Sequence, residues 1–279
     1  MEAGCRPGIF PLSIKTNLSN YLIKCLENKA QAQLPSNTVP NFSLSDAYKT
    51  ALEIKQIREN KKKEKASGIK VGFTNKTIWD KYSVNAPIFG LMYSSTILDN
   101  EQLFSPEKFL EPKFEPEIFF RLSKKPHSEM SNIELLSCCK SFGIGVELVQ
   151  SIYKGWTFTL PDTVAGFGLH GQYKILQEIA IPSDENLRLK IINELRNFNL
   201  ILTKNNTILE QGSSKNILGE SPLVALRSYV EFCEKNSEWL ILNGPITTGT
   251  ITDAYDISEA DVFSCELDRL FEERFVVKF

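Results

Sequence analysis

The chain has 279 residues, enough for one large domain or two modest ones. Its hydrophobic content of 42% and charged content of 24% are ordinary for a globular protein. The formal net charge is −2, so the overall field favours neither a nucleic acid nor an acidic membrane as partner. No run of about 18 apolar residues occurs, and the first residues contain no long apolar stretch. We therefore expect no membrane segment and a cytoplasmic protein.

Cysteine and histidine limit the kinds of metal site that the chain can form. The six cysteines have no C-x-x-C spacing, and we expect them to pack as small buried side chains rather than to form disulfides or bind zinc. Only two histidines occur, His127 and His170, which nearly excludes a histidine-based metal site. A bound metal ion would therefore have to be held by carboxylates.

The N-terminal region of the sequence predicts helices. Glycines and prolines give residues 1–12 the composition of an irregular arm. Apolar residues recur at helical spacing over about 17–33, and Pro35 is expected to end that helix. Ser43 and Asp46 form a capping-box pattern, which predicts a second helix from about residue 43.

The second helix ends in a basic run at 61–65. Such a run can bind phosphate or nucleic acid, but it is more typical of a solvated helix end, where cations lie near the negative end of the dipole. We expect residues 1–65 to form a small helical N-terminal region.

After Gly68 the pattern changes to short β-like runs. Residues 113–122 predict a mostly apolar strand that carries Glu115 and Glu117. Side chains alternate across a strand, so both carboxylates point to one face and repel each other unless a cation lies between them. Oxygen-only ligands suit Mg²⁺ or Mn²⁺ rather than zinc. The alternative, favoured by this pattern taken alone, is a solvated edge strand with acidic residues that prevent aggregation.

A third acid changes the balance between these interpretations. Residues 145–149 predict a buried strand that carries Glu147. An isolated carboxylate in such a run is costly unless it is paired or bound to a metal ion. Glu147 therefore favours the metal site.

The remaining patterns predict a β-rich α+β domain over residues 66–279. The elements expected are a capped helix over 131–141 that includes Cys138 and Cys139, a glycine-rich loop at 162–171, a hairpin at 200–210, a helix from Ser221, and strands at 239–242, 246–252, 262–267 and 275–279.

Seven short segments stand in a fixed order along the chain: GIKVGFT at 68–74, APIFG at 86–90, EPEI at 115–118, GVELV at 145–149, DTVA at 162–165, LGESPL at 218–223 and TGTIT at 248–252. Together they resemble the fumarylacetoacetate hydrolase superfamily, in particular its branch of 2-keto-4-pentenoate hydratases and 4-oxalocrotonate decarboxylases. The resemblance covers most of the chain from about residue 40. It implies a mixed β-roll core that holds one divalent metal ion.

The resemblance also implies a ligand set and an activity. Glu115, Glu117 and Glu147 match the family's metal ligands, in agreement with the strand patterns. Mg²⁺ or Mn²⁺ held by these carboxylates keeps open positions for water or substrate oxygens. The implied protein is a metal-dependent lyase for an unsaturated 2-oxo acid. It acts through a metal-stabilised enolate, as a hydratase or as a decarboxylase. A homo-oligomer is expected.

Further residues match the family's active site. Lys70 matches a lysine that orients the substrate or shuttles a proton with a lowered pKa, although a surface lysine at a strand end is the alternative. Gly249 and Thr252 match a turn that is expected to hold the substrate carboxylate. His170 stands in a loop typical of one hydratase-annotated subgroup, where it is either a proton shuttle or a residue that orders the turn. Ile88 replaces an aspartate of the hydratases, and its segment is closer to the decarboxylase pattern.

Two other functions stay open from the sequence. One is a C–C hydrolase for an acylpyruvate, which needs a water-activating base, and His170 is the only histidine in a matching loop. The other is a non-catalytic partner of a related enzyme, because the proton-transfer acid is missing at Ile88. Tryptophans such as Trp156 more often pack than shape a substrate site.

Overall fold

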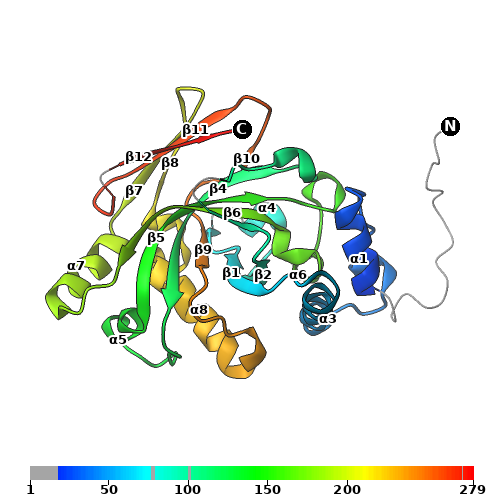
Figure 1. The fold of residues 1–279 in the computed structure, drawn as a ribbon, viewed down its shortest axis with the longest axis horizontal. Helices are drawn as coiled ribbons and strands as arrows, with labels where there is room; N and C mark the ends of the chain where they lie inside the picture. The colour runs from blue at the N-terminus through cyan, green and yellow to red at the C-terminus, as the bar shows by residue number, and fades with distance from the viewer. Residues whose placement is uncertain (1–17, 77–78, 100–101, 272) are drawn as a thin grey trace.

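A computed structural model describes residues 18–76, 79–99, 102–271 and 273–279 (Figure 1). The expected arm at 1–12 lies outside the described residues. The first described elements are the helices α1 (Leu18–Glu27), α2 (Pro35–Thr38) and α3 (Leu44–Lys62). The first strand begins at Ala66. The division of the chain at residue 65, between a helical N-terminal region and a β-rich domain over 66–279, stays a prediction.

Local sequence explains where these helices begin. The Ser43 capping box is confirmed, because the Ser43 hydroxyl accepts a hydrogen bond from the backbone N–H of Asp46 and the Asp46 carboxylate accepts one from the backbone N–H of Ser43. Pro35 does not simply end the first helix, which stops at Glu27. It opens α2 instead, because the first turn of a helix needs no backbone N–H from its first residue.

A curled sheet forms the centre of the molecule (Figure 1). Its strands run in the order β2-β1-β9-β4-β5-β6-β3, and β10 pairs with β4. They are β1 (Ala66–Gly72), β2 (Ile88–Tyr93), β3 (Ile97–Leu98), β4 (Lys113–Leu122), β5 (Cys139–Val149), β6 (His170–Ala180), β9 (Ile246–Thr250) and β10 (Tyr255–Asp256). The strand expected at 113–122 is confirmed. It lies between β9 and β5, so the alternative of a solvated edge strand is wrong.

A second, four-stranded sheet has the order β12-β11-β7-β8. Its strands are β7 (Asn199–Lys204), β8 (Thr207–Ser213), β11 (Val262–Leu267) and β12 (Arg274–Lys278). The described helices after α3 are α4 (Trp79–Tyr82), α5 (Asn132–Ser137), α6 (Leu160–Ala165), α7 (Glu185–Leu195) and α8 (Pro222–Lys235). The predicted hairpin and the start of α8 after Ser221 are confirmed.

Three local predictions are wrong. The segment 162–171, expected to be a loop, contains most of α6 and the start of β6. The helix begins here because Thr159 and Asp162 form a capping box. Cys139 begins β5 instead of lying in a helix. The strand expected at 239–242 is absent from the described residues, because the hydroxyl of Tyr229 donates to the Trp239 carbonyl and accepts from the Ile241 N–H.

The two faces of β4 have opposite environments. Phe114, Ile118 and Phe120 are fully buried in the main hydrophobic cluster. Glu115 and Glu117 alternate with them and point to the other face, toward the inside of the curl. The sheet thus buries a large core on one side of β4 and carboxylates on the other.

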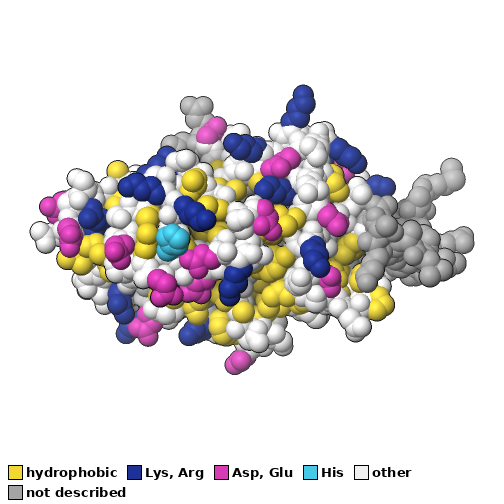
Figure 2. All heavy atoms as spheres, turned by 90° about the horizontal axis from the view of Figure 1, so that it is seen from below, with side chains coloured by type: hydrophobic (Ala, Val, Ile, Leu, Met, Phe, Trp, Pro, Cys, Tyr) yellow, Lys and Arg dark blue, Asp and Glu magenta, His cyan; other side chains and the backbone are white. Residues whose placement is uncertain are grey.

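The surface has no strong charge bias on the face shown in Figure 2, where basic and acidic side chains are interspersed. The five described cysteines are buried, as expected. No helix in the described ranges is both long and apolar enough to span a bilayer.

Close strand packing gives a test of the curled sheet. A Cβ at Gly143 would lie 2.1 Å from the Gln177 carbonyl oxygen of β6 and 2.6 Å from the Phe119 ring. Since backbone cannot move aside, we expect Gly143→Ala to lower the free energy of unfolding by about 3 kcal/mol in urea titrations. Gly155→Ala is the control: its φ is 65° but no atom lies within 4 Å, and it should cost about 1 kcal/mol. Equal costs would contradict this packing.

Candidate metal centre

Strand register brings three carboxylates together. β4 and β5 pair antiparallel with Glu115 directly opposite Glu147, and Glu117 follows two residues along the same face of β4. One oxygen from each side chain can be chosen so that all three lie within 4.8 Å of one another. The three residues are 8%, 0% and 0% exposed for Glu115, Glu117 and Glu147. The cluster expected from two separate strands is therefore present.

Burial and mutual repulsion disfavour the charged forms of these acids. Burial raises the pKa of Glu117 well above its usual value, and the charges of Glu147 and Glu115 raise it further. Burial raises the pKa of Glu147 to about 8, against the lowering effect of Lys70. Burial also raises the pKa of Glu115. Like charges opposite each other on paired strands are destabilising, so this arrangement needs a compensating cation.

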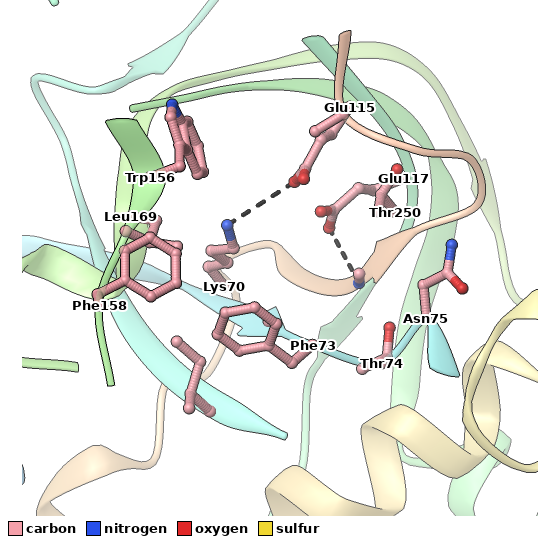
Figure 3. Close-up of a pocket in the computed structure, with 14 residues that line it drawn as sticks. Lys70, Phe73, Thr74, Asn75, Glu115, Glu117, Trp156, Phe158, Leu169 and Thr250 are labelled. Atoms are coloured by element: carbon pink, nitrogen blue, oxygen red, sulfur yellow. Dashed lines mark hydrogen bonds and ion pairs between the residues drawn. The ribbon is translucent and has the colours of Figure 1, made fainter. Parts of the chain in front are cut away.

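Glu117 and Glu147 each have one carboxylate oxygen in a hydrogen bond and a second oxygen that makes none within the described chain. The Glu117 Oε2 accepts a hydrogen bond of 3.0 Å from the backbone N–H of Gly249 (Figure 3). The Glu147 Oε1 lies 2.6 Å from His170 Nδ1. Within the described chain, Glu117 Oε1 and Glu147 Oε2 are buried without a hydrogen-bond partner. Carboxylates that are held at one oxygen, and whose second oxygen makes no hydrogen bond within the described chain, fit a hard divalent cation.

Lys70 of β1 is buried beside this cluster (Figure 3), so the alternative of a surface lysine is wrong. Its Nζ lies 3.5 Å from Glu147 Oε2 and 3.8 Å from Glu115 Oε2. Burial by itself lowers the pKa of Lys70, but the attraction of Glu147, Glu115 and Glu117 outweighs it, and the pKa is raised. The lowered pKa expected for Lys70 is thus not found beside the metal-free carboxylates, where Lys70 holds its proton.

His170 lies behind Glu147 at the start of β6. Its Nε2 is 2.8 Å from the hydroxyl oxygen of Thr96. Burial lowers the pKa of His170 well below its usual value, and the charges of Lys70 and Arg58 act in the same direction. A neutral imidazole that donates from Nδ1 to Glu147 accepts at Nε2 from Thr96. His170 is thus engaged on both sides and is not among the residues that line the pocket beside the carboxylates.

Two of the carboxylates, Glu115 and Glu117, line a pocket with two unlike sides (Figure 3). One side has Glu115, Glu117, Gly249 and Thr250 together with Lys70. The other side is a wall of five apolar side chains, Phe73, Ile88, Trp156, Phe158 and Leu169. We call this second set the apolar wall.

Of the two residues predicted to form the substrate turn, only Gly249 lies at the pocket. Thr252 is fully buried outside the lining, and its hydroxyl donates to the Asp253 carbonyl at 2.9 Å. Thr250 lies at the pocket instead. Ile88 lines the pocket on β2, opposite Gly72 of β1 in the strand register.

The apolar wall contains unusual backbone. Phe73, Trp156 and Leu169 have φ angles of 55°, 55° and 61°, in the left-handed region that bulky residues rarely adopt. Such strain persists only where the surroundings hold it, and it concentrates at functional sites. Sequence patterns did not identify Phe158, Thr74 or Asn75 as pocket residues, although Thr74 ends the matched segment around Lys70 and Asn75 follows it directly.

Comparison with known proteins shows what this chain is similar to. No family model matches the chain. The chain is 24% identical over 227 residues to a 4-oxalocrotonate decarboxylase of Pseudomonas sp. (strain CF600), covering 81% of this chain and 82% of that protein. It is 25% identical over 181 residues to a 2-hydroxypent-2,4-dienoate hydratase of Pseudomonas putida, covering 64% and 78%.

A solved structure agrees with these relatives. The 4-oxalocrotonate decarboxylase from Pseudomonas putida G7, in complex with magnesium and adipate, has a TM-score of 0.83 and 20% identity. The match covers 97% of this chain and 99% of that chain. The predicted α+β fold of the fumarylacetoacetate hydrolase type and the predicted resemblance to its hydratase and decarboxylase branch are confirmed.

The raised pKa values predict how stability depends on pH. The folded carboxylates bind protons more tightly than their unfolded forms, whose pKa is 4.5, so their contribution is complete below that pH and is lost as pH rises through the folded values. With a chelator present, we expect the free energy of unfolding to fall as pH rises toward about 8, most steeply above 6.5, because below that pH the lowered pKa of His170 acts in the opposite direction.

Denaturant titrations with and without excess Mg²⁺ measure this effect. Bound cation should remove most of the fall, because it stabilises the charged carboxylates of the folded state. Glu147→Gln is the matched variant, and its profile in chelator should be flatter. A stability that rises between pH 6.5 and about 8 in the unaltered protein would contradict the prediction.

Proposed function

We propose that this chain is a divalent-metal-dependent lyase of the hydratase/decarboxylase type, acting on an unsaturated 2-oxo acid. The observation that carries the proposal is the buried cluster of Glu115, Glu117 and Glu147, of which Glu115 and Glu117 line a pocket together with Lys70. The curated relatives reported above have one or other of these two activities. Geometry and resemblance thus support the same class of enzyme.

Mg²⁺ or Mn²⁺ is the proposed ion, with Glu115, Glu117 and Glu147 as its ligands. The donor set is made only of carboxylate oxygens, which such hard ions prefer. When bound, the ion supplies Lewis-acid polarisation of a 2-oxo acid. A homo-oligomer is proposed from the family resemblance alone.

The chain's own residues hold and orient the reacting groups. Gly249 fixes Glu117 through its backbone N–H, and His170 fixes Glu147 through its imidazole. Lys70 lines the same pocket with its ammonium 3.8 Å from Glu115 and 3.5 Å from Glu147, so it is placed to orient an anionic substrate and to deliver a proton to it. The apolar wall excludes water from the far end of the substrate.

The two alternative functions are less well supported. A C–C hydrolase needs a base that activates water at the pocket, but His170 is occupied by Glu147 and Thr96. A non-catalytic partner does not need a cluster of buried acids, whose burial is costly. The cluster and Lys70 are both present, although Ile88 supplies no acid.

The deciding experiment uses a panel of 2-hydroxydienoates that includes 2-hydroxymuconate, with Mg²⁺ or Mn²⁺. We expect loss of the dienol absorbance, with CO₂ release marking a decarboxylase and its absence a hydratase. Glu117→Gln should lower the rate by more than about 100-fold, because it removes a proposed ligand charge. Glu129→Gln, at an exposed site, is the control. No reaction in metal-loaded protein, or full activity of Glu117→Gln, would refute the proposal.

His170 should act on metal affinity through Glu147. We expect His170→Asn to weaken Mn²⁺ binding by about 10-fold to 100-fold, the usual effect of removing a group that orients a ligand. Calorimetric titration with Mn²⁺ measures this without any substrate. His127→Asn, which alters an exposed histidine, should leave the affinity unchanged. Unchanged Mn²⁺ affinity in folded His170→Asn would exclude this positioning role.

A further inference from the structure

We infer that the far end of the pocket selects a substrate with an apolar tail over one that ends in a second carboxylate. The inference rests on the proposed function, since it concerns the substrate held at the same pocket. It narrows the substrate class to 2-oxo or 2-hydroxydienoic acids whose only charge lies next to the metal cluster.

The described residues that line the pocket include a single cation, drawn beside Glu115 in Figure 3. Lys70 is the only lysine or arginine among the described lining residues. Its ammonium lies 3.8 Å from Glu115 and 3.5 Å from Glu147, within the carboxylate cluster. It is therefore placed to meet the 1-carboxylate or 2-oxo group and not a distant one.

Among the described lining residues, the apolar wall offers a distal carboxylate no counter-charge. The rings of Phe73 and Phe158 lie 6.4 Å apart, and those of Trp156 and Phe158 lie 6.3 Å apart, so the aromatic portion of the apolar wall is continuous. Even the Trp156 Nε1–H is used, because it donates to the Glu111 carbonyl at 3.1 Å. No polar hydrogen of this wall's side chains is left for a ligand.

One nearby cation needs separate consideration. The Lys113 ammonium lies 5.4 Å from the centroid of a Trp156 ring. It is paired with Asp256 at 2.5 Å and does not line the pocket. Lys113 therefore does not supply the missing charge.

Desolvation then determines whether the pocket binds an apolar tail or a carboxylate tail more tightly. A carboxylate pressed against this wall loses its hydration and gains no ion pair, which costs binding free energy. A methyl or vinyl group at the same place gains from the burial of apolar surface. A decarboxylation would remove the distal carboxylate as CO₂ and so relieve this desolvation cost during the reaction. The affinity for an unreactive ligand, and not the reaction rate, is therefore the direct measure of which tail the pocket selects. Among the proposed activities, an apolar tail favours water addition, because a distal carboxylate is what the decarboxylation removes.

A matched pair of unreactive ligands tests the inference. 2-Oxohexanoate and 2-oxohexanedioate have the same chain length and differ only in a terminal methyl or carboxylate. Calorimetric titration of the Mn²⁺-loaded protein, with pyruvate as the tail-free reference, should give at least about tenfold tighter binding of 2-oxohexanoate than of 2-oxohexanedioate.

A gain-of-charge variant provides the second measurement. Phe158 is only partly buried, so Phe158→Arg places a cation at the wall with little disturbance of the core. We expect Phe158→Arg to reverse the preference in favour of 2-oxohexanedioate, whereas Phe158→Leu should keep it.

The outcomes separate this inference from the proposed function. If the unaltered protein binds pyruvate in its own titration, but binds 2-oxohexanedioate as tightly as 2-oxohexanoate or more tightly, the inference alone is overturned. An unchanged ratio in folded Phe158→Arg also overturns it, because the tail then does not reach the wall. Failure of all three 2-oxo acids to bind overturns the proposed function and the inference together.

Discussion

The pairing of Glu115 with Glu147 across β4 and β5 is the constraint on which the site depends. A slip of one residue would move every side chain of a strand to its other face and remove the cluster. The carboxylates repel one another, so hydrophobic packing on the opposite face of β4 must hold the register. The buried rings of Phe114 and Phe120 provide that packing. The alternation of side chains along β4 therefore packs apolar rings on one face and places mutually repelling carboxylates on the other.

The strands of the site could be predicted because alternation and burial are local properties of sequence. Glu115 and Glu117 share a face in any strand, and Glu147 stands out in an apolar run. Their neighbours could not be predicted, because strand order depends on contacts far apart in the chain. Pro116 even argues against a central strand, since it lacks an N–H for the ladder. A register shift of β4 against β9, between Glu117 and Phe119, lies beside it.

The pKa of Lys70 and the role of His170 could not be predicted from the sequence either. The direction of the Lys70 pKa is set by acids from β4 and β5, which only the fold brings near it. The role of His170 depends on its contacts with Glu147 and Thr96, and Thr96 carried no signal in the sequence. The apolar wall lies partly on irregular segments with left-handed backbone, where no periodicity indicates which side chains point inward. Helix caps, by contrast, were predictable because each is complete within four residues.

The chemistry of the pocket follows from how few groups in it can move a proton. Ile88 has none, and His170 is turned toward Glu147. If the glutamates hold a metal ion, Lys70 is the remaining titratable side chain among the described lining residues. Its Nζ lies 3.5 Å from Glu147 and 3.8 Å from Glu115, so it is placed to pass a proton to a substrate held at this cluster. Protonation of the conjugated chain of a dienol is then the step that this site supports best, and it needs no acid at Ile88.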